Sequence, residues 1–150
     1  MGNTATSSQN NTKATIIARE TWVDDSPSGW STTDANITTP TVQGANTISV
    51  TSTAAPGYAY KEYDCEAGTI YLVRLKVASS QIGAGVAYLK IGTSANNTTN
   101  LNTSMAVTGV YNDLYIVTGS SQTSLFVTLW VQNSMKSVNW SDLLIEQYDV

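Results

Sequence analysis

Apolar and polar residues alternate along much of the chain with a period of two, which is the pattern of a half-buried β-strand. The clearest case is the segment 69–77 (TIYLVRLKV), where every odd position from Tyr71 to Val77 is apolar and Arg74 and Lys76 lie on the other side. We predict that this segment is the central strand of a sheet. The tyrosine-rich segment before it and the apolar segment after it are short enough to pair with it on both sides.

The same alternation recurs in short segments along the rest of the chain. Further strands are predicted at 14–18, 35–39, 47–52, 58–63, 86–91, 105–107, 113–117, 125–131 and 138–148. Pro, Gly, Asn and Ser separate these segments, and the polar stretch 93–100 has the composition of a surface loop. No segment shows a helical period. We therefore predict an all-β fold, a single jelly-roll β-sandwich of about nine or ten strands.

The length of 150 residues suits one domain with its own apolar core. Residues 1–13 carry almost no apolar side chain, too few to offset the entropy of ordering that segment alone. We expect a polar extended arm over 1–19 and the jelly-roll domain over 20–150. No apolar run approaches the roughly 20 residues of a membrane helix, and the N-terminus lacks the apolar segment of a signal peptide. The chain is expected to be soluble and made in a cytosol.

Charge is sparse, and its distribution argues against nucleic acid as a partner. Only 12% of residues are charged, the net charge is −4, and the seven cations form no cluster. Cys65 is the only cysteine, so no intrachain disulfide forms, and a partly buried structural thiol is expected.

The candidate chemistry is also limited. The chain has no histidine, which removes Ser-His-Asp and Cys-His triads and histidine-ligated zinc. A carboxylate pair among Glu62, Asp64 and Glu66 could hydrolyse a glycosidic bond. Alternation instead places these three side chains on one face at a strand end, where a solvated rim is the favoured interpretation. We predict that the protein is not an enzyme.

Aromatic side chains are the main lead to a ligand, because sugar rings stack on exposed aromatic faces. The candidates are Trp22, Trp30, Tyr58, Tyr60 and Tyr111, with Tyr111 expected to be the most exposed. The alternative for each is a place in the core or on an ordinary strand face.

A bound divalent metal ion is a second possibility, since hard cations take carboxylate and carbonyl oxygens. Glu20 or Asp24 near the chain start could meet Asp142 in the last strand, because the first and last strands of jelly rolls often pair. No other cofactor is expected.

Between residues 29 and 148 the order of features resembles the carbohydrate-binding modules of the family 4 and 9 kind, which are galactose-binding-like jelly rolls. Gly29-Trp30 opens the domain, followed by NTISVTS, PGYAYKEY and the AGTIYLVRLKV strand, and Trp140-Ser-Asp142-Leu-Leu matches the final strand of that family. The resemblance implies glycan binding, and it places a calcium ion near Asp142.

The chain is also similar in style to small virion proteins of tailed bacteriophages, which are rich in Thr, Asn, Ser and Gly and carry a polar arm. This resemblance implies a capsid decoration (cement) protein, present on the capsid surface of a virion assembled in the host cytoplasm. Its partners would be the major capsid protein or another virion protein and further copies of itself, with a homotrimer favoured. The arm would bind by strand addition through Thr12, Lys13, Ile16, Ile17 and Arg19. The alternative is a carbohydrate-binding or host-receptor-binding module that belongs to a phage tail or fibre or to a glycan-active system.

Overall fold

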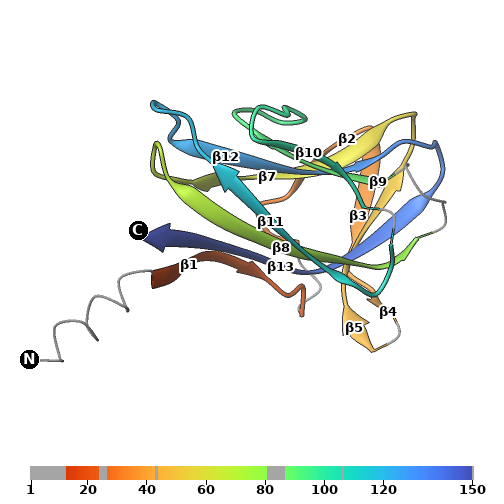
Figure 1. Ribbon diagram of the computed structural model, residues 1–150. Helices are drawn as coiled ribbons and strands as arrows, with labels where there is room; N and C mark the ends of the chain where they lie inside the picture. Colours follow the sequence, from red (N-terminus) through yellow and green to blue (C-terminus); the bar gives the residue numbers. More distant parts are fainter. Residues whose placement is uncertain (1–12, 24–26, 43, 81–86, 106, 150) are drawn as a thin grey trace, which may run out of the picture.

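The computed structural model describes residues 13–23, 27–42, 44–80, 87–105 and 107–149, and within these ranges it contains strands and no helix (Figure 1). None of the described segments is therefore a helix that could cross a membrane. The strands are β1 (Lys13–Glu20), β2 (Ser31–Thr33), β3 (Ala35–Thr38), β4 (Thr41–Val42), β5 (Ala45–Asn46), β6 (Ile48–Ser52), β7 (Gly57–Asp64), β8 (Ile70–Ser80), β9 (Ala87–Gly92), β10 (Leu101–Ser104), β11 (Tyr111–Val117), β12 (Ser124–Val131) and β13 (Ser137–Asp149).

The strands form two antiparallel sheets packed face to face. Sheet A has the order β11-β8-β13-β6-β3, and β1 also pairs with β13; sheet B has the order β10-β9-β12-β7-β2. The short strands β4 and β5 pair only with each other among the described residues. Figure 1 shows the two sheets as separate layers, with β12 and β7 in one and β8 and β13 in the other. The predicted all-β jelly-roll sandwich is confirmed.

Strand β8 lies inside sheet A, between β11 and β13, as its alternation predicted. Tyr71, Val73, Leu75 and Val77 are fully buried on its inner face, whereas Arg74 is on the outer face and only partly buried. The equivalent strand of sheet B is β12, which lies between β9 and β7. Its inward side chains are all fully buried: Leu125, Val127, Leu129 and Val131. The core is therefore the space between these two inner faces.

Strand β10 does not coincide with the predicted strand at 105–107. It spans Leu101–Ser104, and the buried Met105 follows it. The apolar signal came from Met105 and Val107, while β10 itself is an edge strand with mainly polar side chains. The preceding segment 93–100 is a loop, as predicted. Strand β11 begins at Tyr111, two residues before the predicted strand start at 113.

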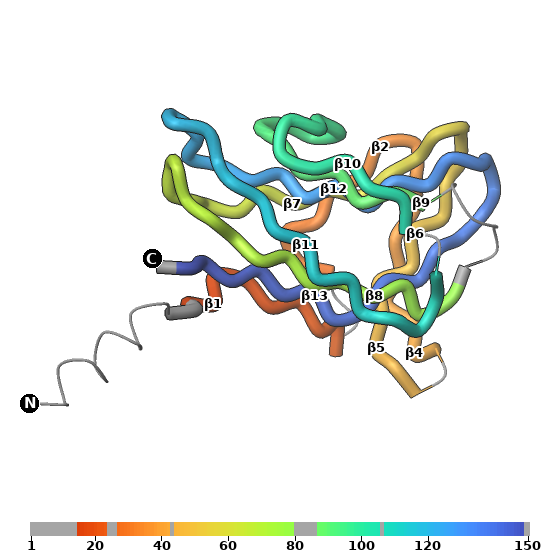
Figure 2. Tube along the Cα trace, in the orientation of Figure 1, coloured from red at the N-terminus to blue at the C-terminus, as the bar shows by residue number. Residues whose placement is uncertain are grey.

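The chain start contributes a strand to sheet A. Strand β1 runs antiparallel to the end of β13, from Lys13 opposite Asp149 to Glu20 opposite Leu143 (Figure 2). Residues 13–19 of the segment expected to be an arm therefore lie in this strand, and Ile17 packs against the core. Ile16 is 54% exposed and Arg19 is exposed, whereas the remaining arm candidate, Thr12, lies outside the described residues.

A carboxylate on β1 links the two sheets. Glu20 Oε2 accepts hydrogen bonds from Trp30 Nε1 at 2.9 Å, Lys61 Nζ at 2.9 Å and Tyr63 Oη at 3.0 Å. Lys61 and Tyr63 belong to β7 of sheet B. The Glu20 side chain of sheet A therefore accepts two hydrogen bonds from the opposite sheet. Because the group is mostly shielded from water, these charge-assisted bonds are stronger than their exposed counterparts.

The core placement predicts the effect of truncating Leu129. This side chain is 0% exposed and lies between Ala59 and Leu89 on the neighbouring strands. Leu129→Ala should lower the free energy of unfolding by about 2–5 kcal/mol, through lost burial and the cavity left behind. Urea unfolding followed by tryptophan fluorescence measures this change. Val117→Ala, at a site 62% exposed, is the control and should change the value by less than about 0.5 kcal/mol. Equal losses in both variants would contradict the described packing.

The Glu20 cluster predicts a stability loss at alkaline pH. Burial, followed by the charge of Glu20 and the hydrogen bond to it, raises the pKa of Tyr63 far above its ordinary value of 10.0. The unfolded chain releases this proton near pH 10, whereas the folded chain keeps it. The contribution of Tyr63 to the free energy of unfolding is therefore complete below pH 10 and is lost as the pH rises above it. Denaturation midpoints measured from about pH 7 to about pH 11 should fall faster for the wild type than for Tyr63→Phe. Parallel curves for the two proteins would rule out this role of Tyr63.

Candidate functional site

Three aromatic side chains form a row across the outer face of sheet B. In the strand register, Trp130 of β12 lies opposite both Tyr58 of β7 and Tyr88 of β9. Residues directly opposite one another share a face, and the apolar neighbours of Trp130 in β12 point into the core, so all three side chains point outward. We call Tyr58, Trp130 and Tyr88 the aromatic row.

The aromatic row continues to both edges of the sheet. Thr33 of β2 lies opposite Tyr58, and Ser104 of β10 lies opposite Tyr88. Five adjacent strands thus contribute one residue each, and four spacings of ~4.8 Å give a row of about 19 Å running across the strands. The three aromatic residues thus lie between a threonine at one end and a serine at the other.

The rings are held in fixed relative orientations. The Tyr88 and Trp130 rings meet at 5.2 Å between centroids and 87°, an edge-to-face arrangement. On β7, Tyr58 contacts Tyr60 with centroids 6.1 Å apart. All four side chains are partly buried, so each keeps some surface open to a ligand.

A loop stands over the middle of the outer face of sheet B. The segment 93–100 joins β9 to β10 and rises above the sheet in Figure 1. The backbone N–H of Asn96 donates to Thr128 Oγ1 at 2.8 Å, and Thr128 is fully buried beneath it. Gly92 permits this close approach, because a Cβ there would clash with Asn97. The loop forms one side of the space beside the aromatic row.

A small open pocket of about 220 Å³ lies next to Trp130. Its lining consists of Tyr88, Lys90, Asn102, Trp130 and Gln132, which combine aromatic surface with amide and ammonium groups. We call this space the Lys90 pocket. It is smaller than the roughly 300 Å³ or more typical of pockets that enclose a drug-sized ligand. A long ligand would therefore lie along the face and place only one unit in the pocket.

The predicted glycan residues are divided between different parts of the molecule. Tyr58 and Tyr60 lie on the outer face of sheet B, as described above. Trp30 is only 8% exposed and Trp22 only 7%, and the two rings contact each other at 6.0 Å between centroids. These two tryptophans belong to the core, so neither presents a stacking surface. The turn-forming residues between Trp22 and Trp30 gave no indication in the sequence that both rings point into the core.

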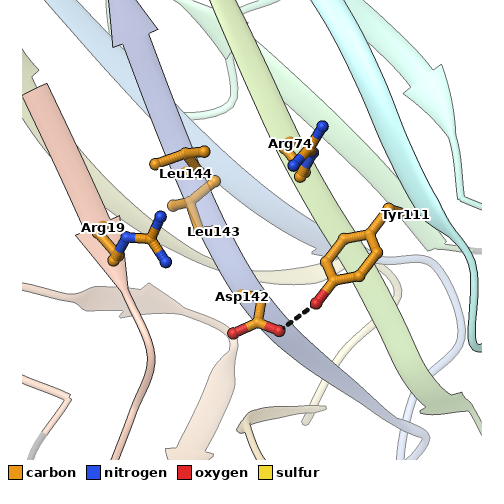
Figure 3. A pocket seen from close by; sticks show the side chains of 6 residues that line it. All are labelled: Arg19, Arg74, Tyr111, Asp142, Leu143 and Leu144. Atoms are coloured by element: carbon orange, nitrogen blue, oxygen red, sulfur yellow. Dashed lines mark hydrogen bonds between the residues drawn. The ribbon is translucent and has the colours of Figure 1, made fainter. Parts of the chain in front are cut away.

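Tyr111 is exposed, as expected, but it lies on the outer face of sheet A. It lines a pocket of about 210 Å³. Figure 3 shows its hydroxyl pointing to Asp142. Tyr111 Oη donates to Asp142 Oδ2 at 2.5 Å, and this hydrogen bond raises the pKa of Tyr111. Arg19 of β1 and Arg74 of β8 line the same pocket. Arg74 is already engaged by Asp113 in two hydrogen bonds, which lower the pKa of that carboxyl group.

Of the predicted metal ligands, Glu20 and Asp142 do not come together. Strands β1 and β13 do pair, with Glu20 opposite Leu143. Glu20, however, points inward to donors of sheet B, whereas Asp142 sits at a β-bulge and points outward to Tyr111. Within the ranges that the structure describes, no three His, Cys, Asp or Glu side chains form a group suited to a metal ion. Asp24 lies outside the described residues.

The acidic group at the end of β7 is a solvated rim, as predicted. Glu62, Asp64 and Glu66 are all exposed, and Glu62 accepts a hydrogen bond from Ser124 Oγ at 2.7 Å. Cys65 is a free, partly buried thiol with its pKa raised by burial.

Sequence analysis did not identify Tyr88, Lys90 or Trp130 as site residues. The alternation of 125–131 does separate Trp130 from the core-facing positions, and this was the available signal. The pairing of Trp130 with both tyrosines depends on strand register, which alternation alone does not determine.

Comparisons with known proteins found similar solved structures. No protein-family model and no curated protein sequence matches the chain. One similar solved structure is the CBM22-1 and GH10 modules of xylanase 10B from Clostridium thermocellum, complexed with xylohexaose. The TM-score is 0.61 at 16% identity, over 88% of this chain and 28% of that one.

Two further structures extend the comparison. A structure described as a CBM4 has a TM-score of 0.58 at 18% identity, over 81% of this chain and 96% of that one. The enzymatically active domain of tailspike protein 4 from bacteriophage CBA120 has a TM-score of 0.58 at 12% identity, over 82% of this chain and 20% of that one. At these identities the likeness concerns the fold: the chain has the jelly-roll fold of carbohydrate-binding modules.

Proposed function

We propose that the protein is a non-catalytic carbohydrate-binding domain whose ligand lies along the aromatic row of sheet B. The observation that carries this proposal is the register that places Tyr58, Trp130 and Tyr88 side by side on one outer face. Aromatic faces contact the C–H surfaces of sugar rings, and the neighbouring hydroxyl and amide groups can bond to sugar hydroxyls.

The shape of the site supports an extended ligand. The aromatic row lies on three adjacent strands, and Thr33 and Ser104 extend its line to both edges of sheet B. The loop 93–100 bounds one side of it. The backbone there is a paired sheet, so little ordering accompanies binding and less of the interaction energy is lost. The chemistry on the face consists of stacking surfaces and hydrogen-bonding groups. Both kinds of contact serve recognition of a ligand.

The similar structures support the same proposal. The Clostridium thermocellum xylanase modules are complexed with xylohexaose, and another similar structure is a CBM4. Both have the fold that this chain has. The tailspike likeness agrees with the phage setting implied by the sequence resemblance, and we propose a virion as the location of this domain.

Capsid decoration is a separate prediction and rests on the sequence resemblance. Of the residues predicted to contact a capsid, Ile16 and Arg19 are exposed on β1. Co-sedimentation with empty shells and the mass of the protein in solution would test the decoration role and the predicted trimer.

The binding proposal predicts a loss of affinity on truncating the aromatic row. Tyr58→Ala should weaken glycan binding about two- to tenfold, corresponding to about 0.5–1.5 kcal/mol from one stacking contact. Calorimetric titration with xylohexaose and with cello- and galacto-oligosaccharides measures the dissociation constants, which we expect in the roughly millimolar to micromolar range.

The matched control is Tyr115→Ala on the outer face of sheet A, where Tyr115 is 59% exposed. This variant should bind as the wild type does. The proposal is refuted if no glycan binds to the folded wild-type protein, or if only the Tyr115 variant loses affinity.

A further inference from the structure

Lys90 occupies a defined position in the pocket beside the aromatic row. Its ammonium group lies 4.2 Å from the centroid of the Trp130 ring and donates to Asn96 Oδ1 at 3.1 Å. An ammonium group has three donors, and a neutral amide and a ring face satisfy its hydrogen-bonding capacity only in part. At least one donor direction is therefore open to the pocket.

The charge of Lys90 is not balanced within the described structure. No carboxylate of the described residues forms an ion pair with it, and the other lining residues of the Lys90 pocket are uncharged. Lys90 and Tyr60 both lie opposite Thr128, so the first carboxylate that β7 places on the same face, Glu62, is two strands across (~10 Å) and two residues along (~7 Å) from Lys90. Glu62 is itself engaged by Ser124. The Lys90 pocket therefore carries a local positive charge on a protein whose net charge is −4.

Because the Lys90 ammonium group is already partly buried, a ligand that covers it removes part of its remaining hydration, which costs free energy. Burial lowers the pKa of Lys90, which shows that its charged form has lost some of its hydration. A neutral sugar over the pocket removes more water from the ammonium group and returns only neutral hydrogen bonds. A sugar with a carboxylate group returns a charge-assisted hydrogen bond, which is shorter and about twice as strong.

We propose that the Lys90 pocket selects glycans that carry carboxylate groups, such as chains containing uronic acids, with Lys90 binding the carboxylate. This inference rests on the proposed function, since it concerns the same face of sheet B. The aromatic row would hold the sugar rings, and Lys90 would decide between acidic and neutral units. Asn102 and Gln132, which line the same pocket, are placed to contact the hydroxyls of the acidic unit.

The test uses two matched pairs of oligosaccharides that differ in charge. The first pair is hexagalacturonate and its methyl ester, and the second is a xylo-oligosaccharide with one glucuronate branch and unbranched xylohexaose. In calorimetric titrations of the wild-type chain, at least one acidic member should bind about tenfold more tightly than its neutral partner, equivalent to about 1.4 kcal/mol. This preference should shrink as ionic strength rises from about 0.01 M to about 1 M, where the Debye length falls from ~30 Å to ~3 Å.

Variants assign the preference to Lys90. Lys90→Met should abolish the preference for the acidic member, whereas Lys90→Arg should retain it. Lys76→Met is the matched control, because the Lys76 ammonium lies 4.7 Å from the Tyr111 ring centroid on the opposite sheet. It removes the same charge and should leave the preference unchanged.

The outcomes separate this inference from the proposed function. If neutral members bind as tightly as acidic ones in both pairs, glycan binding stands and selection by Lys90 is refuted. If Lys90→Met and Lys76→Met reduce the preference equally, the effect is one of net charge and the inference is also refuted. If the folded protein binds none of these glycans and none of the neutral panel, both proposals fail.

Discussion

The mutual burial of two inner sheet faces is the interaction on which the rest of the structure depends. Strand β8 of sheet A and strand β12 of sheet B each place every second side chain in the core, where these side chains are fully buried. Because side chains in a strand alternate strictly, burying one set commits the other set to the outer face. Leu129 and Val131 point inward, so Trp130 between them must point outward. The aromatic row therefore follows from core packing on three neighbouring strands.

The few charged side chains of the chain have distinct roles at separate places. Glu20 and Lys61 link the edges of the two sheets, and Arg74 and Asp113 form a bidentate pair on the exposed face of sheet A. Lys90 differs from these, since it rests on Trp130 and Asn96 and pairs with no carboxylate of the described residues. On the outer face of sheet A, Lys76 also lies over a ring, that of Tyr111. What is particular to the outer face of sheet B is that its cation lies beside three aromatic side chains aligned across neighbouring strands.

Local alternation was sufficient to predict the elements, but long-range pairing was needed to predict the site. The faces of β8 and β12 could be predicted because their apolar and polar positions differ clearly. The pairing of the first and last strands was also expected, yet a bulge in β13 turns Asp142 away from Glu20. Trp30, one of the glycan candidates, lies in the core, its stated alternative, where its ring contacts Trp22 and its indole N–H donates to Glu20. Tyr88 and Trp130 become neighbours only through the register of β9 and β12.

The location of a bound glycan tests the account most directly. Two-dimensional NMR of the labelled protein, titrated with the oligosaccharide that binds most tightly, reports which backbone amides and which of the four tryptophan indole N–H groups respond. The account predicts that the indole signal of Trp130 and the amides of Tyr58, Tyr88 and Lys90 shift together, while β11 and the outer face of sheet A stay unchanged. Shifts centred on Tyr111, Tyr115 and Arg74, with no change at Trp130, would contradict it.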